Sequence, residues 1–319
     1  MNFNKLAFLF PGQGAQYVGM GKALHDNFDV ARQTFEEAND ALGFDLKDII
    51  FNGSEEDLTK TEVTQPAILT TSIATTRVLE LYGIKPEGAA GLSLGEYSAL
   101  VTAGAISFGD ALRTVKKRGR FMQEAVPEGK GKMLSILGLD KNQVAEVCEA
   151  VREAGHYIVP ANYNSPKQIV VSGESEGVAN SEPLFKEKGA KKVKYLSVSA
   201  PFHCDMLAPA AKQLEDELQH VTINKPNITV LSNVTAERFE TPQDIKGRLV
   251  QQVMSPVLLY QSLASLSSNY QFNDFLDVGP RNTMSKLMKK VDRKINLEVV
   301  ETPEDMEQLR KIKEAVANE

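Results

Sequence analysis

Short apolar runs alternate along the chain with longer segments that have a helical pattern. A buried strand is predicted over residues 5–10, because every residue after Lys5 is apolar. An amphipathic helix is predicted over 28–41, where the apolar Val30, Phe35 and Ala38 lie among charged neighbours. Further strands are predicted at 228–231, 272–278 and 297–300. Further helices are predicted at 64–82, 107–126, 244–253 and 257–266, with a polar connection at 57–61. Because strands and helices alternate, we expect an α/β fold with a mainly parallel, covered sheet.

The pattern changes at Gly129, where short strands and helices follow one another in a different order. Strands are predicted at 133–137, 157–163, 168–172 and 191–196, and helices at 142–154 and 175–188. This βαββαβ order is typical of a ferredoxin-like unit. We therefore predict a small ferredoxin-like domain, residues 130–197, inserted into a large α/β-hydrolase-like catalytic domain, residues 1–129 and 198–319. A cleft between the two domains would be the natural ligand site.

The most informative motif is Gly-Leu-Ser-Leu-Gly at 91–95, between a predicted strand at 87–90 and a predicted helix at 96–103. A serine flanked by glycines at a strand-to-helix turn is a nucleophile elbow, in which tight backbone exposes the hydroxyl at a helix N-terminus. Side chains at Gly91 and Gly95 would clash where the strand and the helix meet. The helix N-terminus also stabilises negative charge that develops when a serine attacks a carbonyl. By itself, the motif is equally consistent with an ordinary glycine-serine turn.

A second glycine-containing turn, at 11–16, follows the first predicted strand and precedes a helix predicted over 18–27. Backbone N–H groups point out of such turns, so an anion-binding role and a plain tight turn are both open. The spacing does not match a dinucleotide-binding loop, because Tyr17 occupies the place of the third glycine.

The composition is that of an ordinary soluble globular protein, with 42% apolar and 24% charged residues among 319. The formal net charge of −6 excludes nucleic-acid binding by the chain as a whole. Two cysteines and four histidines show neither disulfide nor metal-ligand spacing, so we expect no metal, no cofactor and a reducing cytoplasm. The apolar run near the N-terminus is too short for a signal peptide, and no stretch is long enough to span a membrane. Nothing in the pattern of apolar residues argues for more than a monomer.

Six stretches together resemble the malonyl-CoA:acyl carrier protein transacylases, and the resemblance covers essentially the whole chain. They are Phe10-Pro11-Gly12-Gln13-Gly14, Gly91-Leu92-Ser93-Leu94-Gly95-Glu96-Tyr97, Lys117-Arg118-Gly119, Ala161-Asn162-Tyr163-Asn164-Ser165-Pro166, Pro201-Phe202-His203 and Val278-Gly279-Pro280. Their order and spacing are highly specific in combination. One departure is Leu92, where many members have a histidine before the nucleophile. That histidine is not the catalytic base of the family, so we expect little loss, although one polar group is removed from the elbow.

The resemblance implies a role for each residue that matches a family motif. Ser93 is expected to be the nucleophile, and His203 the base that takes its proton and returns it to the leaving thiol. Without the resemblance, an isolated histidine is more often a core or surface residue. No acidic third member is required, because a main-chain carbonyl near Gln252 is expected to fix the histidine tautomer. The backbone N–H groups of Gln13 and Leu94 are expected to form the oxyanion hole.

Three further residues are expected to bind the substrate. The guanidinium of Arg118 presents a planar fork that matches the free carboxylate of a malonyl group, which separates this interpretation from a hydrolase. Phe202 is expected to exclude the branch methyl of methylmalonyl, because a bulky ring at this position favours malonyl in related acyltransferases. Asn162 belongs to a matching stretch and is expected to contribute to substrate binding.

The implied reaction is a ping-pong transfer of malonyl from malonyl-CoA to the phosphopantetheine thiol of an acyl carrier protein, in fatty acid biosynthesis. Carrier proteins of this pathway are acidic, so we expect a basic docking patch, although an ordinary solvated charge run explains the same lysines. The candidates are Lys186, Lys188, Lys191, Lys192 and Lys194 in the small domain, and Lys286, Lys289 and Lys290 near the C-terminus.

Three alternatives stay open at this point. A serine esterase or thioesterase of the α/β-hydrolase type shares the elbow motif, but its histidine usually lies near the C-terminus after an acidic residue. A non-catalytic module that docks carrier proteins would need no nucleophile. A free-standing acyltransferase that loads a polyketide synthase would use the same residues.

Overall fold

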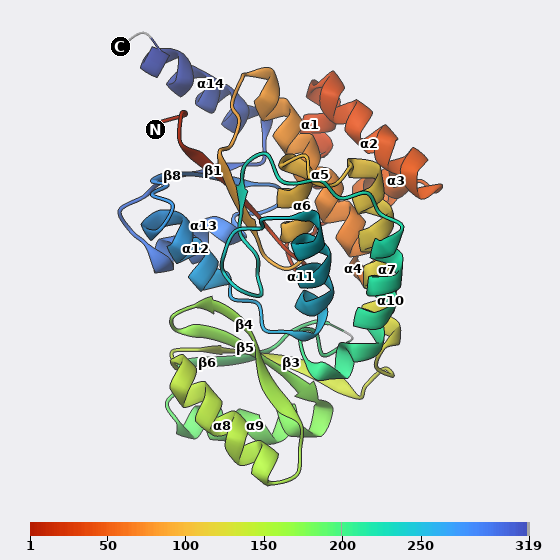
Figure 1. The fold of residues 1–319 in the computed structure, drawn as a ribbon, viewed down its shortest axis with the longest axis vertical. Helices are drawn as coiled ribbons and strands as arrows, with labels where there is room; N and C mark the ends of the chain where they lie inside the picture. Colours follow the sequence, from red (N-terminus) through yellow and green to blue (C-terminus); the bar gives the residue numbers. More distant parts are fainter. Residues whose placement is uncertain (199, 318–319) are drawn as a thin grey trace.

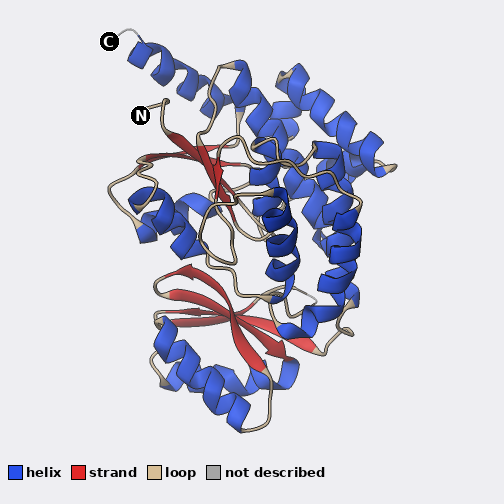
Figure 2. Cartoon of the chain, viewed as in Figure 1, coloured by secondary structure: helices blue, strands red, loops and turns tan. Residues whose placement is uncertain are grey.

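The computed structural model describes residues 1–198 and 200–317, so residues 199, 318 and 319 of the predicted catalytic domain lie outside the described part. The larger part of the chain is built on a five-stranded sheet with the strand order β7-β2-β1-β8-β9 and parallel pairs (Figures 1 and 2). The strands are β1 (Leu6–Phe10), β2 (Gly88–Gly91), β7 (Thr229–Val230), β8 (Asp274–Val278) and β9 (Asn296–Val300). The α/β fold class expected from the sequence is confirmed.

Helices cover both faces of this sheet. The helices of the larger part are α1 (Lys22–Asn27), α2 (Asp29–Leu42), α3 (Leu46–Asn52), α4 (Glu55–Thr59), α5 (Thr61–Leu81), α6 (Gly95–Thr102), α7 (Phe108–Glu124), α10 (Ala208–Gln219), α11 (Pro242–Met254), α12 (Leu259–Ser268), α13 (Thr283–Val291) and α14 (Pro303–Ala317), with a 3₁₀ turn at Asp205–Leu207. Leu6, Phe8 and Phe10 of β1 join one core with α5, α6 and α7, whereas Ala7 and Leu9 join a second core with α12 and α13. Burial on both faces explains why β1 is continuously apolar. Within the described chain, none of the helices is long and apolar enough to cross a membrane.

A second, four-stranded sheet lies at the lower end of the molecule in Figure 1, with the order β4-β5-β3-β6 and antiparallel pairs. Its elements are β3 (Gly131–Leu137), α8 (Lys141–Glu153), β4 (Ile158–Ser165), β5 (Gln168–Glu174), α9 (Ser175–Glu187) and β6 (Lys192–Tyr195). Val147 of α8 and Phe185 of α9 pack on one face, and Met133 and Val170 of the strands join the core of the larger part. This is the ferredoxin-like arrangement expected, and the boundaries of a separate domain at 130–197 stay a prediction.

Main-chain hydrogen bonds at Val257 join the small sheet to the larger part. The N–H of Val257 donates to the carbonyl of Ala161 at 2.8 Å, and its carbonyl accepts from the N–H of Tyr163 at 2.9 Å. These two bonds hold Asn162 of β4 against the segment that follows α11.

Two local predictions were wrong. Residues 57–61 are not a polar connection, because α4 occupies most of them. Its N-terminus is capped by the side chain of Ser54. Acidic residues fill its first turn, where their negative charge interacts favourably with the helix dipole. The helix predicted over 18–27 begins only at its fifth position, because Gly19 and Gly21 have left-handed φ angles of 92° and 74°.

Candidate active site

Ser93 occupies a sharp turn between the end of β2 and the start of α6. Its φ of 52° is left-handed, which is uncommon for a residue other than glycine. A Cβ atom at Gly91 would lie 2.0 Å from the carbonyl carbon of Gly95, and one at Gly95 would lie 2.3 Å from the carbonyl oxygen of Phe10. Only glycine fits at both positions, and the turn has the geometry of a nucleophile elbow.

The guanidinium of Arg118, on α7, lies against the serine and is buried, with 1% of the residue exposed. One terminal nitrogen donates to the Oγ of Ser93 at 3.0 Å and to the Oε1 of Gln252 at 2.8 Å. The other donates to the Oε1 of Gln65 at 2.8 Å. The guanidinium carbon also lies 5.6 Å from the centre of the Tyr97 ring, within the range of a cation–π contact. Neutral oxygen acceptors and one aromatic ring therefore surround the cation.

Within the described part of the chain, Arg118 forms no ion pair, and the carboxyl that acts on its charge, that of Glu96, has a pKa of about 8 and is largely protonated near pH 7. Its neighbours Lys117 and Arg120 form ion pairs with Glu217 and Glu124 nearer the surface. Burial disfavours the charged form and lowers the pKa of the Arg118 guanidinium. A buried charge is normally paired, so an unpaired guanidinium at the bottom of a site indicates an anionic ligand.

His203 also has a left-handed backbone, with a φ of 61°, and is 4% exposed. Its Nδ1 lies 2.8 Å from the main-chain oxygen of Gln252. Because a carbonyl only accepts, Nδ1 carries the proton and Nε2 presents a lone pair. Burial, and then the charge of Arg118, lower the pKa of His203 to about 4 from its ordinary 6.5. The imidazole is therefore neutral near pH 7, as a general base must be.

Gln252, on α11, connects these groups. It is fully buried, whereas its neighbour Gln251 is exposed. Its main-chain oxygen accepts from His203, its Oε1 accepts from Arg118, and its Nε2 donates to the main-chain oxygen of Ser93 at 3.0 Å. The family resemblance implied only the main-chain contact, and the two side-chain contacts come from the structure.

Seven of the eight predicted site residues line one cavity of about 470 Å³. They are Gln13, Ser93, Leu94, Arg118, Asn162, Phe202 and His203. Gln252 does not line the cavity but contacts three of these residues. Met133 and Val170 of the small sheet line the cavity together with residues that follow β1 and β2, so the cavity lies between the two sheets.

Two main-chain N–H groups are available at this cavity. Within residues 1–198 and 200–317, the N–H groups of Gln13 and Leu94 donate to no protein acceptor. A Cβ atom at Gly12 would lie 2.3 Å from the carbonyl oxygen of Leu92, so glycine lets the first loop approach the elbow. Gly14 has open space around it, and its φ of 103° is the reason that glycine is required there. Both donors are suited to a developing oxyanion.

Three buried polar residues near the serine were not anticipated from the sequence. Gln65 accepts a hydrogen bond from Arg118, although its position near the start of a long helix gave no sign of this. Glu96 directly follows the elbow, and burial raises the pKa of its carboxyl to about 8. Asn233 accepts the N–H of Ser93 from 140 residues further along the chain, and no sequence pattern links the two.

The fold and the site define the class of serine acyltransferases. An activated serine alone would suit a hydrolase equally well, whereas a buried, unpaired cation beside the serine suits an acyl group that carries its own negative charge. The family model of the acyl transferase domain matches residues 7–309. Within that class, the chain belongs to the family of malonyl CoA-acyl carrier protein transacylases.

The individual relatives and solved structures described next each match at least 95% of this chain. The malonyl CoA-acyl carrier protein transacylase of Bacillus subtilis is 45% identical over 304 residues, which cover 95% of this chain and 96% of the relative. That of Escherichia coli K12 is 41% identical over 303 residues, covering 95% and 97%. The crystal structure of the transacylase from Clostridium perfringens is 44% identical with a TM-score of 0.93, covering 99% and 100%. A malonyl-transacylase in complex with a type II PKS acyl-carrier protein is 38% identical with a TM-score of 0.93, covering 97% and 99%.

Proposed function

We propose that this chain transfers the malonyl group from malonyl-CoA to the phosphopantetheine thiol of an acyl carrier protein, through a malonyl ester of Ser93. The observation that carries the proposal is the buried guanidinium of Arg118, which donates to Ser93 Oγ at 3.0 Å and has no carboxylate partner among the described residues. In the free protein, neutral oxygens accept the hydrogen bonds that Arg118 donates. A malonyl carboxylate replaces them with a charge-assisted pair, which fixes the thioester carbonyl beside the serine.

In the first half-reaction, Nε2 of His203 takes the proton of the Ser93 hydroxyl while Oγ bonds to the thioester carbon. The carbonyl oxygen becomes an oxyanion, for which the N–H groups of Gln13 and Leu94 are the donors. When the intermediate collapses, the carbon–sulfur bond breaks, and the CoA thiolate receives the proton from the imidazolium. The ester and free CoA remain, and the imidazole is again neutral.

In the second half-reaction, the carrier's thiol enters the same cavity and follows the same steps in reverse. Its proton goes to His203, its sulfur attacks the malonyl ester, and the serine oxygen leaves with the proton. Both thiols end a pantetheine arm, so one channel serves both substrates. Apolar side chains that line the cavity disfavour water as an acceptor. They are Met122, Met133, Val170, Leu196, Val198 and Leu287.

Selection of malonyl over methylmalonyl is assigned to Phe202, which is 6% exposed and lines the cavity. A ring in this position overlaps the space that a branch methyl would need. Asn162 lines the same cavity from β4 of the small sheet and is proposed to bind the substrate.

The carrier protein is proposed to dock beside α13, where Lys286 and Lys290 line the cavity and the latter donates to Gln168 Oε1 at 2.7 Å. None of the candidate lysines of the small domain lines this cavity, and Lys186 and Lys188 already form ion pairs with acidic residues. Reversing the charge at Lys286 and Lys290 should raise the KM for carrier protein more than that for malonyl-CoA. The matched control is charge reversal at Lys191 and Lys192, which should leave both KM values unchanged. A higher KM for carrier protein in this control, with no change on reversal at Lys286 and Lys290, would show that the carrier docks on the small sheet.

The function is tested by weighing the intact protein after incubation with malonyl-CoA, and then weighing a carrier protein added to it. We expect one malonyl group on the wild type, none on Ser93→Ala, and transfer of that group to the carrier. Parallel incubations with methylmalonyl-CoA and acetyl-CoA measure selectivity. A carrier-docking module would acquire no malonyl group, and a thioesterase would release malonate without loading the carrier.

A polyketide carrier protein is a second candidate acceptor, because one structural neighbour was solved with a type II PKS acyl-carrier protein. Comparing the rates at which malonyl reaches a fatty-acid carrier and a polyketide carrier separates the two. We further infer that the enzyme acts as a cytoplasmic monomer without a cofactor, because the proposed steps use only side-chain and main-chain groups of this chain and its two cysteines lack disulfide spacing.

A further inference from the structure

Asn233 follows the short strand β7 and is fully buried. Up to Leu231, this segment pairs with β2 through the main chain, and the N–H of Leu231 donates to the carbonyl of Ala89 at 3.2 Å. The next carbonyl in this register, that of Gly91, accepts instead from the side-chain Nδ2 of Asn233 at 2.7 Å. The Oδ1 of the same amide accepts the N–H of Ser93 at 2.7 Å. One side-chain amide therefore continues the sheet ladder past the end of β7 and into the elbow.

Both main-chain polar groups of Ser93 are held from outside the elbow. Its N–H is bound by Asn233, and its carbonyl accepts from Nε2 of Gln252 at 3.0 Å and from the N–H of Glu96 at 3.1 Å. A left-handed residue other than glycine persists only where its surroundings over-determine its conformation. Within the described residues, Asn233 is the acceptor that fixes the N–H side of this strained serine.

Asn233 is itself fixed at every polar group. Its N–H donates to the buried carboxyl of Glu96 at 2.6 Å, and its carbonyl accepts the N–H of Leu258 at 2.7 Å. Its Oδ1 also lies 3.3 Å from Nε2 of Gln252. The side-chain amide therefore has little freedom to rotate. Because it is fixed by the surrounding core, it fixes the position of Ser93 relative to that core.

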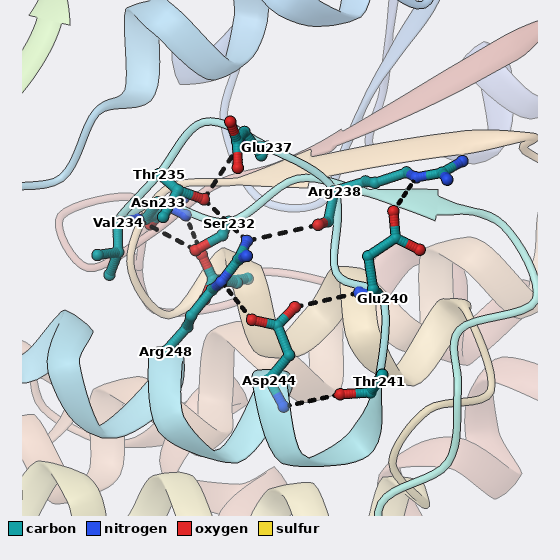
Figure 3. Close-up of polar contacts among 11 residues, drawn as sticks. Ser232, Asn233, Val234, Thr235, Glu237, Arg238, Glu240, Thr241, Asp244 and Arg248 are labelled. Atoms are coloured by element: carbon teal, nitrogen blue, oxygen red, sulfur yellow. Dashed lines mark hydrogen bonds and ion pairs between the residues drawn. The ribbon is translucent and has the colours of Figure 1, made fainter.

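Figure 3 shows how the loop that carries Asn233 is fastened to α11. Arg248 donates to the Oγ1 of Thr235 at 2.8 Å and pairs with Asp244 one turn earlier on the helix. One turn later, the same helix carries Gln252. The loop and the helix thus form one unit, which contacts the N–H and the carbonyl of the serine.

We propose that Asn233 is a positioning residue that holds Ser93 in its reactive left-handed conformation. This inference rests on the proposed function of Ser93 as the nucleophile. Because Asn233 occupies the N–H of Ser93, the neighbouring N–H of Leu94 is the elbow donor that stays available to the oxyanion. Loss of the amide frees the turn to relax and displaces both the hydroxyl and this donor.

The test is the single-turnover rate at which malonyl-CoA acylates Ser93, followed by the mass of the intact protein. Asn233→Ala should acylate on the order of 100-fold more slowly, the loss expected when a reacting group is misplaced by about 1 Å. The malonyl-CoA concentration for half-maximal rate should change by less than about two-fold, because Asn233 does not contact Arg118. Asn224→Ala, at an exposed position before β7, is the matched control and should keep the wild-type rate.

Asn233→Asp keeps the shape of the side chain. It also makes the acylation rate depend on pH in a way that a merely structural role would not. An ionised aspartate accepts the N–H of Ser93 but cannot donate to the carbonyl of Gly91, whereas the protonated acid can do both. Burial raises the pKa of the adjacent Glu96 to about 8 despite the charges of Arg118 and Arg248, so we expect the pKa of an equally buried acid at position 233 to be raised as well. The ratio of its acylation rate to that of the wild type should therefore rise as the pH is lowered from about 8 to about 6.

The outcomes separate the two proposals. A wild-type protein that malonyl-CoA does not label at Ser93 overturns the proposed function, and the positioning role falls with it. A labelled wild type together with Asn233→Ala that acylates at the wild-type rate overturns the positioning role alone. If Asn233→Ala does not fold, the Asn233→Asp variant decides, and a rate ratio that is independent of pH overturns the inference.

Discussion

Replacing Arg118 by alanine tests the centre of the proposed chemistry. The guanidinium is buried and lies within hydrogen-bonding distance of the nucleophile, and the carboxylate of a malonyl group is proposed to bind to it. Acetyl-CoA has the same thioester and the same pantetheine arm but lacks this carboxylate. The ratio of kcat/KM for malonyl-CoA to that for acetyl-CoA therefore isolates the carboxylate clamp.

The magnitude follows from the contacts. A hydrogen bond to a charged group contributes about 1.5–3 kcal/mol, so a bidentate pair contributes about 3–6 kcal/mol. At about 1.4 kcal/mol for each factor of ten, the ratio should fall by about 10² to 10⁴. The same substitution leaves the acceptors Gln65 and Gln252 without their donor, but this loss affects both substrates and cancels in the ratio.

The assay is the rate of acyl transfer to a carrier protein from each CoA ester, with Arg120→Ala as the matched control. Arg120 lies on the same helix, but its side chain is 51% exposed and pairs with Glu124, so the ratio should stay unchanged. A second readout comes from His203, whose pKa is lowered partly by Arg118. In Arg118→Ala, the acidic limb of acetyl transfer should move to higher pH. A malonyl-to-acetyl ratio within about three-fold of the wild type would refute the clamp, because even one charge-assisted bond is worth more than that.

Three further predictions concern the elbow, the base and a buried acid. Gly91→Ala should lower the free energy of unfolding in urea by about 3 kcal/mol, the upper range for overpacking, because the new Cβ would lie 2.0 Å from Gly95. Gly247→Ala, a helical control with open space around it, should stabilise by up to about 1 kcal/mol, and equal midpoints for the two variants would contradict the steric argument. For malonyl-CoA, kcat/KM should stay flat from pH 7 to pH 5, because the pKa of His203 is about 4, and a limb near 6.5 would show an unperturbed imidazole. The pKa of Glu96 is about 8 in the folded protein, above its ordinary 4.5. Between these two pH values the folded state binds this proton more tightly than the unfolded state, so the free energy of unfolding falls as the pH rises from about 4.5 to about 8. Glu96→Gln should flatten that fall, and identical urea midpoints against pH in the two proteins would exclude this burial effect.

Local sequence patterns were sufficient for the elements that form the frame of the site. Continuous apolar runs mark strands that are covered on both faces, and the glycines at 91 and 95 mark the turn, because no other residue fits so close to neighbouring backbone. The resemblance added roles for Ser93, Arg118 and His203, and the structure places all three at one cavity. The helix α4 was missed because its polar composition hides a capped first turn.

The sequence by itself determined the order of the elements, the position of the elbow and the types of residue available for chemistry. Only the tertiary structure decided which side chains meet, because parallel strands bring together segments that lie far apart in the chain. Asn233 reaches the N–H of Ser93 across 140 residues, and Gln252 reaches its carbonyl across 159. Burial, which no local pattern specifies, then makes His203 neutral and leaves Arg118 as a cation that forms no ion pair among the described residues. These properties depend on how completely the two sheets and their helices exclude water from the cavity, and that exclusion arises only when the chain is folded.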